Sequence, residues 1–395
     1  MMKRKPYTAI LFILALPHFS ANANAMATDR GSVIGVEALG TKNQSELQAI
    51  AADFPGNIKV NSGADMYRIS YWTVLKRKPV RASGLFSVPH DDLKPKGVVM
   101  YLHGTNMTRS LSPSQPDRVD GNEETAIFAG NGYYVVLPDY VGLGISTEPQ
   151  AYIVTKPQVD ASLDMLRAVR KVAAQMKLNW FPSLYMMGFS QGGQSVAGVH
   201  RELEKRPLPG YSLKGSIGVA GPYALRQISL PKLACPASLE NYNIGYLAFA
   251  AYAYATYYDR PLDDVFAPQL VVLIPPLFDG SKSPAEIISA LPDDARKLFQ
   301  PQFLRDLESQ KGNWFRAAID ANETFKWVPK APFRAYFGES DANVAAEASN
   351  VFFNYARSRG GNISVHSLGR VDHQTSASLT YAPALAWFDE FSSAH

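Results

Sequence analysis

The 395-residue chain contains a single cysteine, Cys235, so no disulfide can form within it. Metal sites built on several cysteines are therefore excluded, and the seven histidines show no His-Glu-x-x-His or comparable ligand spacing. Charge of one sign does not dominate, with 39 basic against 35 acidic side chains. Because there is also no basic stripe with interleaved aromatic residues, we expect no nucleic acid partner.

Long apolar runs are missing as well, so we predict no stable membrane span. The apolar stretch 8–19 is too short to cross a bilayer, but it follows three basic residues at 3–5 and precedes small residues at 21–25 that contain two Ala-x-Ala patterns. This arrangement predicts a signal peptide over residues 1–25 and export to the periplasm or the medium. Its removal takes three positive charges and no negative ones, so the formal net charge falls from +4 to +1.

Apolar runs that alternate with helical patterns predict an α/β fold with a mostly parallel sheet. The alternating stretches 66–75 and 80–88 favour an antiparallel hairpin, and the continuous apolar runs after them favour buried parallel strands. The expected parallel strands are 98–102, 133–137, 184–187, 216–220, 333–337 and 362–368. The expected helices of this part are 121–130, 157–176, 191–205, 344–357 and 376–391.

The predicted helix 157–176 is amphipathic, with Val159 and Leu163 among the residues of its apolar face. Asp160, Asp164 and Arg167 fall on the opposite, polar face.

Between residues 222 and 331 the alternation stops and the chain becomes helical and rich in proline. We therefore divide the chain into a core of 26–221 and 332–395 and a helical cap insertion of 222–331. Residues 245–258 are almost all Ala, Tyr, Leu or Phe, which is typical of a buried helix. A second interpretation is that this helix, together with the apolar run 269–278, supplies contacts to an acyl pocket. Both interpretations stay open, and both can hold for one helix.

The stretch Gly188-Phe189-Ser190-Gln191-Gly192-Gly193 lies between a predicted buried strand and a predicted helix. A Gly-x-Ser-x-Gly sequence in that position is typical of a nucleophile elbow, where a strained turn presents the serine hydroxyl at the carboxyl end of the strand. A glycine-rich turn with an ordinary serine is the alternative.

Ser190, Asp341 and His373 each follow a predicted parallel strand, in the order Ser, Asp, His. The carboxyl ends of parallel strands meet at one edge of the sheet, so we expect the three side chains to converge there. An imidazole can take the proton of the serine hydroxyl, and a carboxylate can hold the imidazole in one tautomer. The backbone N–H groups of Gln191 and Thr105 are the expected oxyanion donors.

The acid has competitors in Asp372 and, more distantly, Glu339. We favour Asp341, because consecutive side chains in the predicted loop 371–373 point in different directions and would carry Asp372 away from its neighbour His373.

The remaining histidines and Asp139 have structural interpretations. We expect His103 to shape the oxyanion turn, His366 to pack in or at the edge of its strand, and Asp139 to cap the glycine-rich turn after it, or else to brace the active-site loops. Outside the predicted signal peptide, three further histidines are not placed for catalysis: His90, His200 and His395.

From about Met66 to its end the chain resembles the α/β-hydrolase fold, and within it the secreted bacterial and fungal lipase/esterase group. The resemblance is carried by five motifs in order: His103-Gly104-Thr105, Pro138-Asp139-Tyr140-Val141-Gly142-Leu143-Gly144, the Ser190 stretch, Gly338-Glu339-Ser340-Asp341-Ala342-Asn343-Val344 and Asp372-His373. It implies hydrolysis of small-molecule or lipid carboxylic esters without a cofactor.

The sequence therefore predicts a secreted serine carboxylic ester hydrolase that works through an acyl-enzyme. A serine peptidase or amidase on the same fold is one alternative, since the same catalytic residues serve amides. A non-catalytic binding protein that keeps the fold is the other.

Overall fold

The structure is a computed structural model that describes residues 29–90, 93–115, 121–231, 241–308 and 312–392. The predicted signal peptide, Cys235 and His395 lie outside the described residues. No helix in the described part of the chain combines the length and apolar character that a membrane span needs.

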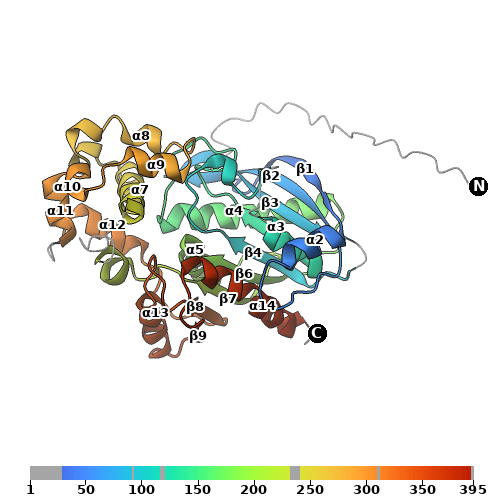
Figure 1. Cartoon of the computed structure of the whole chain (residues 1–395). Helices are drawn as coiled ribbons and strands as arrows, with labels where there is room; N and C mark the ends of the chain where they lie inside the picture. Colours follow the sequence, from blue (N-terminus) through green and yellow to red (C-terminus); the bar gives the residue numbers. More distant parts are fainter. Residues whose placement is uncertain (1–28, 91–92, 116–120, 232–240, 309–311, 393–395) are drawn as a thin grey trace, which may run out of the picture.

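A nine-stranded sheet forms the centre of the core, in the order β1-β2-β3-β5-β4-β6-β7-β8-β9 (Figure 1). The first three strands are antiparallel, and the six from β5 to β9 run parallel. The strands are β1 Val33–Lys42, β2 Ala64–Leu75, β3 Lys78–Pro89, β4 Gly97–Leu102, β5 Tyr133–Pro138, β6 Ser183–Phe189, β7 Ser212–Val219, β8 Phe333–Phe337 and β9 Ile363–Ser367.

Helices cover both faces of this sheet. One face packs on α4 Thr155–Gln175, α5 Gln191–Lys205 and α13 Glu347–Arg357. The other packs on α2 Gln44–Ala51, α3 Asn122–Ile127 and α14 His373–Ser392. Short 3₁₀ turns occur at η1 Arg109–Leu111, η2 Ala129–Asn131, η5 Leu262–Asp264 and η6 Pro268–Leu270.

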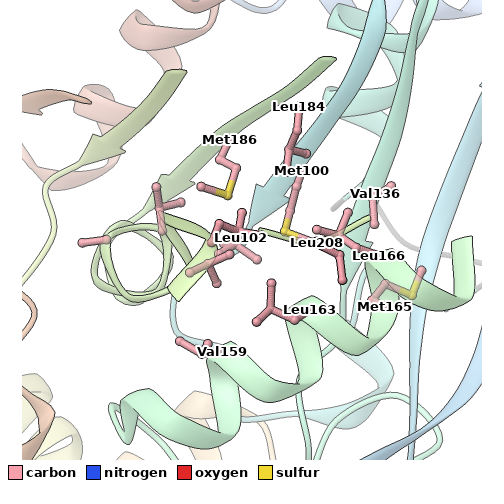
Figure 2. Packing of buried hydrophobic residues seen from close by; sticks show 14 of the residues in the cluster. Met100, Leu102, Val136, Val159, Leu163, Met165, Leu166, Leu184, Met186 and Leu208 are labelled. Carbon is pink, nitrogen blue, oxygen red and sulfur yellow. The ribbon is translucent and has the colours of Figure 1, made fainter. Parts of the chain in front are cut away.

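The continuous apolar strands are explained by this double cover. In β4, side chains 98, 100 and 102 pack in the hydrophobic cluster on the face covered by α4, and side chains 99 and 101 pack in the cluster on the face covered by α14. Successive residues of a strand point to opposite faces. When both faces are covered, every side chain of the strand is buried, and the strand is apolar along its whole length. Figure 2 shows Met100 and Leu102 of β4 facing Leu163 and Leu166 of α4.

The predicted α/β-hydrolase architecture, its antiparallel hairpin and its parallel strands are thus confirmed. Two elements were not predicted, the strand β1 and the helix α2. β1 lies at the edge of the sheet, carries mixed polarity and breaks register near Gly35 and Gly40. A solvated edge strand of this kind lacks the alternation on which the prediction depends.

Asp160 and Asp164, on the polar face of α4, are both buried. Asp164 is fully buried and accepts hydrogen bonds from Thr73 Oγ1 at 2.8 Å and Arg30 Nε at 3.0 Å. Arg30 also reaches Asp160 at 2.9 Å. The chain before β1 therefore covers this side of the helix, and buried carboxylates are tolerated there because they are paired.

Between β7 and β8 the chain leaves the sheet and forms a group of helices to one side of it (Figure 1). They are the π-helical turn η3 Leu225–Ser229, α7 Asn241–Tyr257, α8 Ile274–Leu277, α9 Pro284–Ala290, α10 Ala295–Leu298, α11 Pro301–Glu308 and α12 Trp314–Asn322. These helices share a hydrophobic cluster that also includes Met107 and residues 151–154, with Phe249 of α7 fully buried in it.

Candidate active site

Ser190 lies between β6 and α5 with φ 56° and ψ −119°. A positive φ is strained for a residue with a side chain, and such strain persists where the surroundings enforce it. At Ser190 the surroundings that enforce the strained conformation are neighbouring backbone segments that approach the turn closely. A Cβ on Gly188 would lie 2.4 Å from the carbonyl oxygen of Gly192, and a Cβ on Gly192 would lie 1.7 Å from that of Leu102. Only glycine fits at these two positions.

The structure brings Ser190, His373 and Asp341 into one hydrogen-bonded chain. Ser190 Oγ lies 2.9 Å from His373 Nε2, and His373 Nδ1 lies 2.7 Å from Asp341 Oδ2. Because an ionised carboxylate only accepts, Nδ1 carries the imidazole proton and Nε2 is left to accept the proton of the serine hydroxyl. The side chains of His373 and Asp341 are 9% and 1% exposed, whereas Ser190 is half-buried.

Asp341 is held at its second oxygen as well. Oδ1 accepts the backbone N–H groups of Asn343 and Val344, both at 2.8 Å. The loop that carries Asp341 packs directly on the segment before His373, where the amide of Ser340 donates to the carbonyl of Val371 at 3.2 Å. These contacts position the two side chains relative to each other.

Asp372 does not reach the imidazole. His373 is the first residue of α14, which corrects the predicted loop, and Asp372 caps that helix by accepting from the amide of Thr375 at 2.8 Å. This hydrogen bond holds the pKa of the exposed Asp372 carboxyl below its usual value. Glu339 is also turned away and accepts from Ser367 Oγ at 2.7 Å.

The two expected oxyanion donors lie beside Ser190, since Gln191 and Thr105 line the same cavity. Gln191 begins α5, and an amide of a first helical turn has no acceptor within its own helix. His103 stabilises the turn before Thr105. Its Nδ1 lies 2.7 Å from the carbonyl oxygen of Gly104, and its ring packs at 4.3 Å on that of Tyr140.

Asp139 acts as a brace, the second of its two expected roles, and does not cap its own turn. Its fully buried carboxylate accepts Ser83 Oγ at 2.6 Å, the amide of Ser114 at 2.9 Å and the hydroxyl of Ser114. Burial raises the pKa of Asp139, and the serine hydrogen bonds oppose that shift. The carboxylate ties β3 to the segment around Pro113, which lines the active-site cleft.

The remaining described histidines lie apart from Ser190. His200 is buried between Ser216 Oγ at 2.8 Å and Glu204 Oε1 at 2.9 Å. His366 lies on the edge strand β9, where its ring stacks on Tyr336 at 4.7 Å. His90 lies 3.5 Å from a carboxylate oxygen of Asp65.

Two cavities meet at Ser190, and Thr105 and His373 line both. The wide cavity has a volume of about 410 Å³ and includes polar side chains from α3 and α14, among them Glu123 and Gln374. The narrow cavity has a volume of about 100 Å³. Its wall is largely apolar and comes mainly from the helices between β7 and β8, through Leu225, Leu230, Leu247, Ala250, Phe315 and Ile319.

The run 269–278 takes no part in lining either cavity, which corrects the expectation that it supplies acyl contacts. Val272 is 80% and Leu273 55% exposed. Among the described residues no group of three or more His, Cys, Asp or Glu side chains is arranged to hold a metal ion.

Comparisons with known proteins agree with this architecture. A crystal structure of a Legionella pneumophila protein described as a hydrolase superposes with a TM-score of 0.85 at 24% identity, covering 91% of this chain and 98% of that one. The rice cell wall degrading esterase LipA from Xanthomonas oryzae gives 0.81 at 24% identity, covering 92% and 98%. Candida antarctica lipase A in its closed state gives 0.68 at 15% identity, covering 92% and 82%. No curated protein sequence matches.

The chain has the α/β-hydrolase fold. Residues 123–215, which include the Ser190 turn, match the family model of the secretory lipases. On this match the enzyme class is that of the carboxylic ester hydrolases, and the resemblance to secreted lipases and esterases is confirmed.

Proposed function

We propose that the enzyme is an exported serine ester hydrolase in which Ser190 is the nucleophile, His373 the general base and acid, and Asp341 the group that orients His373. The observation that carries the proposal is the hydrogen-bonded chain from Ser190 Oγ through His373 to Asp341, with links of 2.9 Å and 2.7 Å. It starts at a strained serine that opens onto two cavities.

In the proposed reaction Ser190 Oγ attacks the carbonyl carbon of the ester while His373 Nε2 takes its proton. The N–H groups of Gln191 and Thr105 stabilise the negative charge that develops on the carbonyl oxygen. His373 then gives its proton to the alcohol oxygen as the acyl–oxygen bond breaks. A water that His373 deprotonates attacks the acyl carbon. The acid leaves as the bond from that carbon to Ser190 Oγ breaks, and His373 returns the proton to Ser190 Oγ.

We propose further that residues 222–331 form a cap whose helices supply the acyl site. The narrow cavity is apolar and bounded by η3, α7 and α12, so it suits the hydrocarbon part of the acyl group, whereas the wide cavity suits the alcohol part. The buried α7 would then serve as a core helix of the cap and as a wall of the pocket.

Export is supported by the signal-peptide pattern of residues 1–25 and by the secretory-lipase match. Cleavage after Ala25 would leave a mature protein that begins at Met26. Intact-mass measurement of protein recovered from periplasm and medium tests both the cleavage and the final compartment.

The deciding experiment compares p-nitrophenyl esters with amino-acid p-nitroanilides, using the wild type and Ser190→Ala. We expect ester turnover by the wild type, and a loss on the order of a million-fold in Ser190→Ala if the chemical step limits the rate. A fluorophosphonate should label the peptide that contains Ser190. Faster anilide than ester hydrolysis would favour a peptidase or amidase, and no turnover of either would favour a binding protein.

A further inference from the structure

Tyr152 is a buried tyrosine in the segment between the glycine-rich turn after β5 and the start of α4. It lines the narrow cavity together with Ser190, Gln191 and Thr105. A phenol therefore shares a cavity of about 100 Å³ with the proposed nucleophile and with both proposed oxyanion donors.

The hydroxyl of Tyr152 has a proton to give. Thr105 Oγ1 donates to the Tyr152 oxygen at 3.1 Å, so the phenol accepts in this hydrogen bond and its own proton points elsewhere. Thr105 is its only hydrogen-bond partner within the part of the chain that the structure describes. Tyr254 lines the same cavity, but its hydroxyl already donates a hydrogen bond to the carbonyl oxygen of Ile153 at 3.1 Å.

Burial also keeps that proton in place. It raises the pKa of Tyr152 to about 12, although the hydrogen bond from Thr105 opposes the shift. At neutral pH the group is therefore a donor, and an anionic oxygen is the acceptor that strengthens such a hydrogen bond most.

The ring of Tyr152 is fixed by the proposed cap. It stacks on Phe249 of α7 with centroids 4.4 Å apart and planes at 10°, and Phe249 stacks in turn on Phe278 at 5.0 Å and 11°. Phe249 and Phe278 are both buried. The position of the phenol oxygen is thus set before substrate arrives, and a preorganised donor is effective in a transition state.

We infer that Tyr152 is a catalytic residue whose hydroxyl donates a third hydrogen bond to the carbonyl oxygen of the ester, beside the amides of Gln191 and Thr105. No bond forms or breaks at Tyr152 and its proton stays on the phenol oxygen. The inference rests on the proposed function, because it assigns a donor to the oxyanion formed by attack of Ser190.

The test is Tyr152→Phe, which keeps the ring stack and removes only the hydroxyl. We expect kcat to fall about ten- to a hundred-fold with KM within about twofold of wild type, since the donor acts mainly on the transition state. The inhibition constant of a trifluoromethyl ketone, which forms a tetrahedral oxyanion on the serine, should rise by the same factor by which kcat/KM falls. Unchanged kcat and inhibition constant in Tyr152→Phe would overturn the inference.

Two further variants separate direct donation from a structural role. Tyr258→Phe removes the hydroxyl of another tyrosine of the proposed cap. This hydroxyl accepts from Asn322 at 2.7 Å, and Tyr258 lines neither cavity, so both constants should stay at the wild-type values. Thr105→Val breaks the Thr105–Tyr152 hydrogen bond but keeps the amide of residue 105, and should cost less than Tyr152→Phe. An equal loss in Thr105→Val, with no further loss in the double variant, would mean that Tyr152 only positions Thr105 and would refute direct donation.

The same assays distinguish this inference from the proposed function. Turnover that survives in Ser190→Ala would refute the proposed nucleophile. If Ser190→Ala is inactive and Tyr152→Phe is fully active, the role of Tyr152 is refuted and the proposed function stands. Thermal unfolding of each variant establishes that the comparison is made between folded proteins.

Discussion

The carboxylate of Asp341 meets Nδ1 of His373 at 2.7 Å through one oxygen and binds two backbone amides through the other. Both oxygens are thereby committed, so the carboxylate cannot turn away from the imidazole without losing the two amide hydrogen bonds. An amide side chain at position 341 could not reproduce this arrangement, because its NH₂ group would face either the imidazole N–H or the two backbone N–H groups.

We therefore expect Asp341→Asn to lower kcat by about three to four orders of magnitude, through the wrong imidazole tautomer. The measurement is kcat for a p-nitrophenyl ester at saturation.

Asp372→Asn is the matched control, because asparagine caps a helix about as well as aspartate and should keep the hydrogen bond to the amide of Thr375. We expect it to retain kcat within about tenfold, the remaining effect coming from the lost charge near the imidazolium. A greater loss in Asp372→Asn, with both variants folded, would assign the acid to Asp372.

The turn at Ser190 depends on the absence of a side chain at Gly192, where a Cβ would lie 1.7 Å from the carbonyl oxygen of Leu102. That oxygen belongs to the end of β4, so the clash cannot be relieved by a side-chain rotation. We expect Gly192→Ala to lower the free energy of unfolding by about 3 kcal/mol or more, as measured by urea denaturation. Gly35→Ala, with nothing within 4 Å of its Cβ position, should stay within about 0.5 kcal/mol. Equal stabilities would show that the backbones can separate at no cost.

Much of the core could be predicted from the sequence because its signals are local. The strands β4, β5 and β6 are short apolar runs. Ser190, Asp341 and His373 each follow a parallel strand, so the rule that carboxyl ends of parallel strands meet brings them to one edge. The start of α14 at His373 had a local signal too. Asp372 is a favoured helix-capping residue, and it moves the helix start upstream of the predicted Ser376.

The rest depends on contacts between segments that are distant in sequence. Arg30 pairs with Asp164 across 134 positions, and nothing near either residue predicts the other. Tyr152 meets Thr105 across 47 positions, and its ring is placed by Phe249 of a helix further along the chain. The burial of Asp164 and the hydroxyl pair beside Ser190 therefore come from the tertiary structure, which local pattern does not encode.

The narrow cavity should set the preference for acyl chains. Ala250 of α7 lines it, so Ala250→Phe would fill the space that the hydrocarbon needs. Each methylene lost from the cavity should lower kcat/KM about fourfold, from about 0.8 kcal/mol of burial, so the variant should favour shorter acyl chains than the wild type. The measurement is kcat/KM for a series of p-nitrophenyl esters of increasing acyl length. Val272→Ser, on the exposed run, is the control and should leave the profile unchanged. If Ala250→Phe also leaves it unchanged, the acyl group does not enter this cavity.

His200 should make the stability of the fold depend on pH. The imidazole is buried between Ser216 and Glu204, and burial lowers its pKa, although the contact with Glu204 opposes the shift. The unfolded chain then binds a proton at His200 at a higher pH than the folded one. The contribution of the neutral imidazole to the free energy of unfolding is therefore complete above the unfolded pKa of about 6.5. It is lost as the pH falls from there toward the folded pKa, by at most about 1.4 kcal/mol per pH unit.

In His200→Gln no such proton is taken up, so the difference in free energy of unfolding between wild type and variant should narrow between about pH 7.5 and pH 5.5. Urea denaturation at several pH values measures this difference, and one that stays constant across the range would show that His200 carries the same proton in both states.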